Sequence, residues 1–301
     1  VMFAPTVLPK RVNKAAGADL IQTSACNYYE AVTQPEVEQY YEEKKRAVHT
    51  DTPPSFGLNS RLVKCDGGLV EEMYRADGLY GAAIHEIIHW LELAQEVAEN
   101  DCQCHVISLL VAYYRTGDLR LFDEYSIAWL KEQEGQVDFI NGFIEVYGDP
   151  LGMKASWEGI VEYKDMEATR RTQTISSHAQ WFEDHAPISP QFRKKQVKGV
   201  TAHVVCAAML GGDEYPSTAI GINLPNAEWI RAMYGSKSVT IGNLTEAYNK
   251  VAHGNGFLDE FVIDGQTRAM IERYGDLCDD LHTDLHECLG HGSGQLLPGV
   301  D

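Results

Sequence analysis

The hydrophobic pattern of this chain changes character near residue 136, and this change limits the possible folds most strongly. Before this point apolar residues recur every three or four positions, which predicts helices. After it, short runs rich in β-branched and aromatic residues are separated by proline and glycine turns, which is typical of strands. The predicted helices of the first portion span Gln34–His49, Gly81–Glu99, Cys102–Tyr114 and Leu119–Lys131.

The second portion mixes both kinds of element. We predict strands over Val137–Tyr147, Trp157–Tyr163, Thr201–Leu210 and Ser217–Leu224. Helices are predicted over Met166–Asp184 and from Gln266 to His291. With 301 residues, the chain can form one large domain or two ordinary ones.

Charge and cysteine content narrow the classes of function. The formal net charge of −19 would repel a phosphate backbone, so nucleic acid is not an expected partner. The seven cysteines are scattered and odd in number, which favours free thiols in the cytoplasm over a disulfide framework. The longest apolar runs are too short to cross a bilayer, so no membrane partner is expected. The chain starts at Val1, and we expect it to be an internal piece of a longer protein.

A regular HExxH motif, HEIIH, occurs at His85–His89 inside a predicted helix. On a helix these two histidines lie about 40° apart, close enough to chelate zinc. However, both fall on the polar flank of that helix, as residues of a solvated surface do. No third histidine or glutamate at a suitable spacing completes a zinc site. We therefore favour a surface helix over a metal site formed by His85, Glu86 and His89.

A second motif, HECLGHGSG at His286–Gly294, has its histidines five positions apart. A regular helix would hold their rings about 140° apart, too far round for one metal ion. One extra residue in the turn, a π-type bulge, would bring His291 to the position that the fourth residue after His286 has in a regular helix. The backbone freedom of Gly290 favours such a distortion. The spacing alone leaves a zinc site and a pair of core histidines open as alternatives.

The segment HECLGHGSGQLLPG resembles the HExxGH metal motif of the dipeptidyl peptidase III family, and its residues are similar to those of the bacterial branch. Members of this family are zinc peptidases that remove dipeptides from the amino end of short peptides. Two further segments agree with the family: GFIEVYGDPLG at Gly142–Gly152 and GINLPNAEW at Gly221–Trp229. Because three collinear segments match, the resemblance is specific and covers nearly the whole chain.

For the metal site, the resemblance implies that His286 and His291 are zinc ligands and that Glu287 is the general base. The family's third ligand is a glutamate further along the chain, which here would lie beyond residue 301. We therefore expect one zinc ion per complete protein, with weak or no zinc retention and little peptidase activity for this chain alone.

For the substrate, the resemblance implies five contacts. Glu145 would hold the free α-ammonium group of the peptide, and Glu158 would help to anchor it. Tyr147 would donate to the oxyanion, and Asn223 and Asn226 would bind the first residues of the peptide backbone. Without the resemblance, these residues read as ordinary strand and turn residues.

The resemblance also implies an α+β fold with two lobes around a wide cleft. The lower lobe, with a β-barrel core plus helices, would comprise residues 1–165 and 204–255. The mostly helical upper lobe, which carries the zinc motif, would comprise residues 166–203 and 256–301.

The expected function is therefore that of a cytoplasmic zinc metalloprotease, a dipeptidyl peptidase of the aminopeptidase kind, whose partners are short peptides with a free N-terminus. Two alternatives come from other classes. The chain could be a non-catalytic peptide-binding protein or an inactive fragment without the third zinc ligand. It could also be an unrelated metalloprotease that uses the HEIIH motif.

Overall fold

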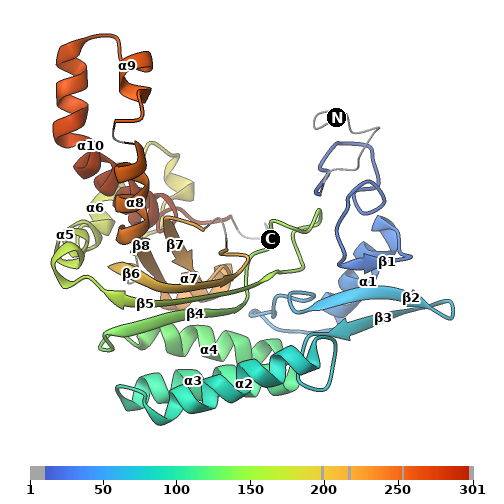
Figure 1. The fold of residues 1–301 in the computed structure, drawn as a ribbon. Coiled ribbons are helices and arrows are strands. Elements are labelled where there is room, and N and C mark those ends of the chain that lie inside the picture. Colours follow the sequence, from blue (N-terminus) through green and yellow to red (C-terminus); the bar gives the residue numbers. More distant parts are fainter. Residues whose placement is uncertain (1–10, 198–199, 216–217, 253, 298–301) are drawn as a thin grey trace. The chain divides into compact units, whose positions relative to one another are not determined.

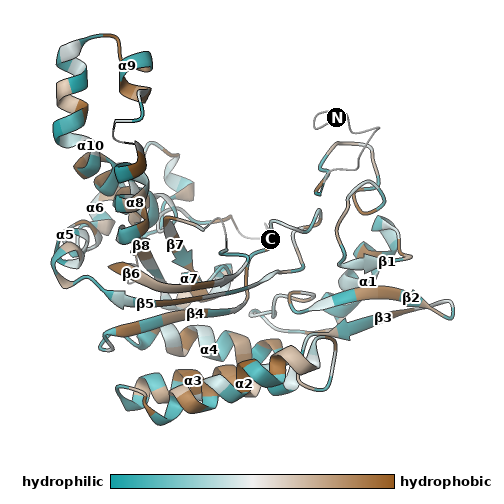
Figure 2. Cartoon of the chain, viewed as in Figure 1, coloured by the Kyte–Doolittle hydropathy of each residue, from teal (hydrophilic) through white to brown (hydrophobic). Residues whose placement is uncertain are grey.

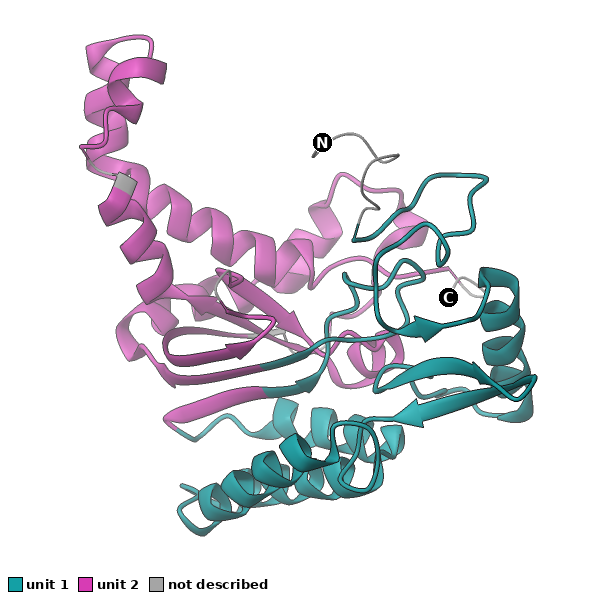
Figure 3. Cartoon of the chain, turned by 45° about the vertical axis from the view of Figure 1, so that its right-hand side comes forward, with its two compact units in different colours: residues 1–135, 141–158 teal, residues 136–140, 159–301 magenta. Residues whose placement is uncertain are grey.

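The computed structural model describes residues 11–197, 200–215, 218–252 and 254–297. The chain forms two compact units (Figure 3). Unit 1 comprises residues 1–135 and 141–158, and unit 2 comprises residues 136–140 and 159–301. The division differs from that of the predicted lobes, whose assignment stays a prediction and whose ends at residues 1–10 and 298–301 lie outside the described residues.

The predicted helices of the first portion are present in unit 1 (Figure 1). They are α1 (Gln34–Ala47), α2 (Gly81–Glu96), α3 (Asp101–Thr116) and α4 (Leu119–Lys131). The Asn100 side chain caps α3 by accepting a hydrogen bond from the Gln103 backbone N–H, and Gly117 ends it with a left-handed φ of 74°. Apolar and polar segments alternate along α2 and α3 in Figure 2, as expected for helices with one buried face.

Unit 1 also contains a three-stranded sheet, so the prediction of a wholly helical first portion was wrong. Its strands are β1 (Tyr29–Glu30), β2 (Ser60–Cys65) and β3 (Gly68–Met73). The order is β1-β2-β3, with the first pair parallel and the second antiparallel. Asp66 and Gly67, with φ angles of 51° and 80°, form the two-residue hairpin turn between β2 and β3. A buried apolar cluster lies beside this sheet, formed by Ile21, Val32, Val37, Tyr41 and Leu62.

A five-stranded sheet organises unit 2, in the order β4-β5-β6-β8-β7. The strands are β4 (Val137–Phe143), β5 (Trp157–Lys164), β6 (Val200–Gly212), β7 (Gly221–Leu224) and β8 (Ser236–Ile241), and the division between the units falls inside β4 and β5. Strand β8 pairs parallel with β6 and antiparallel with β7. All six residues of β8 are buried, including those with hydroxyl side chains. The four strands predicted for this portion are present, and residue 217 of the last one lies outside the described residues.

The helices of unit 2 include one long helix that leads into the histidine motif. The elements are α5 (Met166–Ser176), α6 (Ala179–His185), η1 (Pro190–Phe192), α7 (Glu228–Tyr234), α8 (Gly242–Ala252), α9 (Phe257–Phe261), α10 (Gly265–Leu285) and η2 (His286–Gly290). Helix α5 bonds to β6, since the Thr169 hydroxyl donates to the Val204 carbonyl over 3.2 Å. Side chains of both α5 and β8 hydrogen-bond to α10, so the long helix lies against the sheet.

The predicted α+β class is confirmed by these two sheets and their helices. The barrel core expected for the lower lobe stays a prediction. Within the described part of the chain, no helix is both long enough and apolar enough to cross a bilayer.

Candidate metal centre

The end of α10 departs from regular helical geometry at the histidine motif. The five residues His286–Gly290 form a π-helical turn, η2. The His291 N–H donates to the His286 carbonyl over 3.0 Å, a bond that spans five residues instead of four. The predicted bulge is therefore confirmed, and it returns the second histidine to the face of the helix that carries the first.

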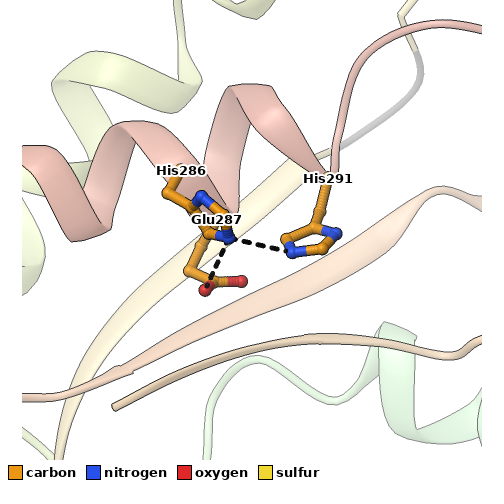
Figure 4. Close-up of side chains that lie close together, drawn as sticks. All are labelled: His286, Glu287 and His291. Atoms are coloured by element: carbon orange, nitrogen blue, oxygen red, sulfur yellow. Dashed lines mark hydrogen bonds and ion pairs between the residues drawn. The ribbon is translucent and has the colours of Figure 1, made fainter. Parts of the chain in front are cut away.

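This turn brings together three side chains of kinds that can bind a metal ion. The Nε2 atoms of His286 and His291 lie 3.1 Å apart, and Glu287 Oε1 lies 4.0 Å from His286 Nε2 (Figure 4). Both imidazoles are exposed, whereas the Glu287 side chain is buried. Among the described residues, this is the one group of three or more potential ligands within 4.8 Å of one another.

The surroundings of the cluster favour the protonation states that metal chemistry needs. Burial raises the pKa of Glu287 to about 7, and the nearby Arg231 guanidinium partly opposes this shift. A carboxyl group with such a pKa can take up and release a proton near neutral pH. Burial lowers the pKa of His291, and the neighbouring His286 and Arg231 lower it further. The neutral imidazole, which is the form that binds metals, is thereby favoured.

Asp284 fixes the long helix one half-turn before the motif. Its carboxylate is fully buried and accepts hydrogen bonds from the hydroxyls of Thr172 on α5 (2.8 Å) and Thr240 on β8 (3.0 Å). The Arg171 guanidinium lies 3.5 Å from the same carboxylate. Cys288 is 1% exposed and packs against Ala202 of β6, so this cysteine is a core residue. These contacts connect the helix to the sheet and to α5.

Asn223, expected to bind the peptide backbone, has its side chain inside a hydrogen-bond network of the protein. Its Nδ2 atom lies within hydrogen-bonding distance of Ser236 Oγ (3.2 Å), Ser238 Oγ (2.6 Å) and the Glu287 carbonyl (3.2 Å). Its Oδ1 atom accepts from Arg231. The structure therefore brings Asn223 to the metal-binding turn, while its contact with peptide stays a prediction. Asn226, in the loop after β7, is exposed.

The other predicted substrate residues belong to unit 1. Glu145 and Tyr147 follow β4, where the Tyr147 side chain is 80% exposed. Glu158 is a buried residue of β5. The participation of these three residues in a common site with the histidine motif stays a prediction.

The HEIIH motif forms part of the exposed surface of α2. His85, Glu86 and His89 are all exposed, and no further ligand joins them among the described residues. The surface helix that we favoured for this motif is confirmed.

Three residues near the cluster were missed by the sequence reasoning. Ser238 donates to the Glu287 carbonyl over 3.1 Å, and Arg231 donates to the His291 carbonyl over 2.8 Å. A Cβ atom on Gly221 would lie 2.5 Å from Glu287 Oε1, so only glycine leaves room for this carboxylate. The alternation of hydroxyl residues in SKSVTI was a usable signal for a strand with a polar buried face.

The fold and the cluster define a class of α+β chains in which one distorted helical turn presents two histidines and a glutamate. Within that class, the chain belongs to peptidase family M49, whose family model matches residues 65–300. This assignment confirms the family expected from the three sequence segments.

Relatives agree with the assignment. Dipeptidyl peptidase 3 of Rattus norvegicus is 26% identical over 262 residues, which cover 86% of this chain and 34% of that protein. The same-named protein of Dictyostelium discoideum is 26% identical over 236 residues, covering 77% of this chain and 32% of the relative. The chain thus spans about a third of the length of these curated relatives.

Solved structures share the fold. DPP III from Caldithrix abyssi superposes with a TM-score of 0.72 at 23% identity, over 89% of this chain and 49% of that one. Dipeptidyl-peptidase III from Corallococcus sp. strain EGB gives a TM-score of 0.62 at 23% identity, over 73% of this chain and 40% of that one.

Proposed function

We propose that this chain carries the metal-binding core of a zinc-dependent dipeptidyl peptidase that releases dipeptides from the amino end of short peptides. The observation that carries this proposal is the convergence of the His286 and His291 Nε2 atoms, 3.1 Å apart, beside a buried glutamate. Membership of peptidase family M49 and the names of the relatives support the class of reaction. The cytoplasm stays the predicted compartment, because all seven cysteines are free thiols.

The two imidazoles fit zinc. Nitrogen ligands at about 2.0–2.1 Å from a tetrahedral zinc ion lie about 3.3 Å from one another, close to the separation in this structure. Both histidines would hold the ion, and a glutamate outside residues 1–301 would complete a set of three protein ligands. Zinc bound by these residues would supply a Lewis acid, able to lower the pKa of water and to polarise a carbonyl group.

Glu287 would move the proton in this reaction. Its carboxylate is buried beside the two histidines, and its pKa of about 7 lets it accept a proton from water and later donate it to the leaving amine. The position of the cut would be set by groups that hold the end of the peptide. In this proposal Glu145 and Glu158 bind the terminal ammonium, Asn223 and Asn226 bind the backbone, and Tyr147 stabilises the oxyanion.

Dipeptide release from a peptide with a free amino group, measured with the complete protein that contains this chain and the third zinc ligand, tests this proposal. We expect Glu287→Gln to lower kcat by roughly 10²–10⁴-fold, the usual contribution of a general base. The matched control is His85→Ala in the exposed HEIIH motif, which should leave the rate unchanged. An N-acetylated substrate should resist cleavage, because the ammonium contact is lost.

Two results would overturn the proposal. Wild-type protein that binds such peptides and never cleaves them would favour the peptide-binding alternative. Loss of activity in His85→Ala and not in Glu287→Gln would assign the chemistry to α2.

A further inference from the structure

The π turn at the metal centre changes the bonding of one backbone carbonyl. In a regular α-helix, the Glu287 carbonyl would accept from the N–H of His291, four residues later. Here that N–H donates to the His286 carbonyl instead. A buried carbonyl without a donor is costly, so the π form requires another partner for the Glu287 carbonyl.

The sheet supplies that partner through two side chains. The Ser238 hydroxyl of β8 donates to the Glu287 carbonyl over 3.1 Å, and Asn223 Nδ2 of β7 lies 3.2 Å from the same oxygen. Both residues are buried, with 2% and 8% of their surfaces exposed. A carbonyl oxygen has two lone pairs and can accept from both donors at once.

These donors are themselves held in place. Asn223 Nδ2 also donates to Ser238 Oγ over 2.6 Å, and the Ser238 hydroxyl in turn donates to the Glu287 carbonyl. Arg231 donates to Asn223 Oδ1 and also to the His291 carbonyl, so one guanidinium connects the amide to the far end of the turn. Side chains of the sheet and of α7 therefore contact the turn at both ends of the hydrogen bond between the His291 N–H and the His286 carbonyl, through the Glu287 carbonyl and the His291 carbonyl.

We propose that Ser238 and Asn223 are positioning residues that hold the metal-binding turn in its π form. Without them, the Glu287 carbonyl would regain a partner only by taking back the His291 N–H. The turn would then be a regular one, with the two imidazoles about 140° apart around the helix axis. The effect on metal affinity rests on the proposed function, in which both histidines bind zinc, whereas the effect on the turn does not.

Ser238 is the better residue to test, because Asn223 is also a predicted peptide contact. The zinc dissociation constant is measured in the complete protein, by competition with a chromophoric chelator, for wild type, Ser238→Ala and Ser238→Thr. We expect the alanine variant to bind zinc roughly 10–100-fold more weakly, the usual effect of removing a residue that orients metal ligands. Threonine keeps the hydroxyl and should restore affinity close to that of wild type.

Thr245→Val is the matched control for loss of a buried hydroxyl. The Thr245 hydroxyl donates to the Ile241 carbonyl within unit 2 and touches none of the residues of the turn described above. This variant should keep wild-type zinc affinity even where its Tm falls as far as that of Ser238→Ala. A purely structural role for Ser238 would move Tm and leave the zinc affinity alone.

A second measurement needs no metal. In Ser238→Ala the His291 N–H must leave the His286 carbonyl to reach the Glu287 carbonyl, so its hydrogen bond opens more often than in wild type. Exchange of the His291 amide hydrogen in the zinc-free protein should therefore be faster in Ser238→Ala than in wild type and unchanged in Thr245→Val. Wild-type exchange together with wild-type zinc affinity in Ser238→Ala would overturn the positioning role. If wild type binds zinc no more tightly than His286→Ala, the proposed function fails, and the exchange rates alone decide the role of Ser238.

Discussion

At the scale of single residues, the surroundings of Glu287 matter more than its place in the motif. Its carboxylate is buried, lies 4.0 Å from the His286 imidazole and packs against the backbone of Gly221 on β7. Burial raises its pKa, and the contact with Gly221 restricts the direction in which the carboxylate points.

Gly221→Ala should separate activity from stability. The new Cβ would lie 2.5 Å from Glu287 Oε1, so the carboxylate must move. Since a flexible side chain can yield, we expect a small change in Tm but a loss of kcat/KM of at least about tenfold, as misplaced catalytic groups produce. Gly275→Ala on α10, where the nearest atom is an ordinary 3.6 Å away, is the control and should keep full activity. Wild-type kcat/KM in Gly221→Ala would show that the position of this carboxylate is not critical.

The residues of the cluster could be predicted from sequence, but the residues that hold them could not. His286, Glu287 and His291 lie close together in sequence, so their spacing and the geometry of a π turn already predicted a common face. Ser238 and Asn223 are 49 and 64 residues away from the carbonyl that they bind. Nothing local in the sequence indicates a contact that only the pairing of β7 with β8 creates.

At the scale of elements, strongly periodic helices were predicted well and polar strands poorly. Helices α1 to α4 occur within a few residues of the predicted ranges. The hairpin of β2 and β3 was missed, although Asp66 and Gly67 are a common pair for its turn. Strand β8 was missed because SKSVTI has few apolar residues, and its buried hydroxyls serve as hydrogen-bond partners of α10 instead.

The π turn itself gives a prediction about Gly290. The sequence suggested that the backbone freedom of this glycine favours the bulge, yet its φ is not among the positive values of the chain. A Cβ atom at this position would meet only His286 Nδ1, at 3.9 Å. We therefore expect Gly290→Ala to keep wild-type zinc affinity and to raise the free energy of unfolding by up to about 1 kcal/mol.

Chelator competition and urea unfolding check the effect of Gly290→Ala. A clear loss of zinc affinity in this variant would mean that the glycine, and not the contacts from the sheet, permits the distortion.

At the scale of the whole molecule, the chain has an excess of negative charge. The sheet of unit 2 nevertheless buries an ion pair and a further carboxyl group. The chain has 44 acidic and 25 basic residues. Lys237 Nζ on β8 lies 2.9 Å from Asp138 Oδ2 on β4, and both side chains are buried. Glu162 on β5 is 1% exposed, and neither of its carboxylate oxygens has a hydrogen-bond partner among the residues that the structure describes.

Glu162 should make the stability of the protein fall as pH rises. Burial, with Asp138 nearby, raises the pKa of Glu162 from 4.5 to about 8 in the folded protein. Between these values the folded state holds a proton that the unfolded state has lost. The stabilising contribution is therefore complete below pH 4.5 and disappears as pH rises through about 8, by at most about 1.4 kcal/mol per pH unit.

Urea unfolding of wild type and Glu162→Gln at pH 5, 7 and 9 measures this effect. The glutamine variant should gain stability relative to wild type as pH increases. Glu246→Gln on α8, where the side chain is 64% exposed, is the control for loss of one charge. A difference between Glu162→Gln and wild type that does not change with pH would contradict the prediction.

The shortness of the π turn has a consequence for how the protein assembles. Only four residues separate the two histidines, so a cation that binds both of them closes a very short loop of chain. Such a loop restrains the rest of the unfolded polypeptide very little. Within residues 1–301, a cation bound by these histidines therefore does not bring distant segments together. The pairing of β7 with β8 does not involve the ion, so stripping the ion with a chelator should leave the far-ultraviolet circular dichroism spectrum intact.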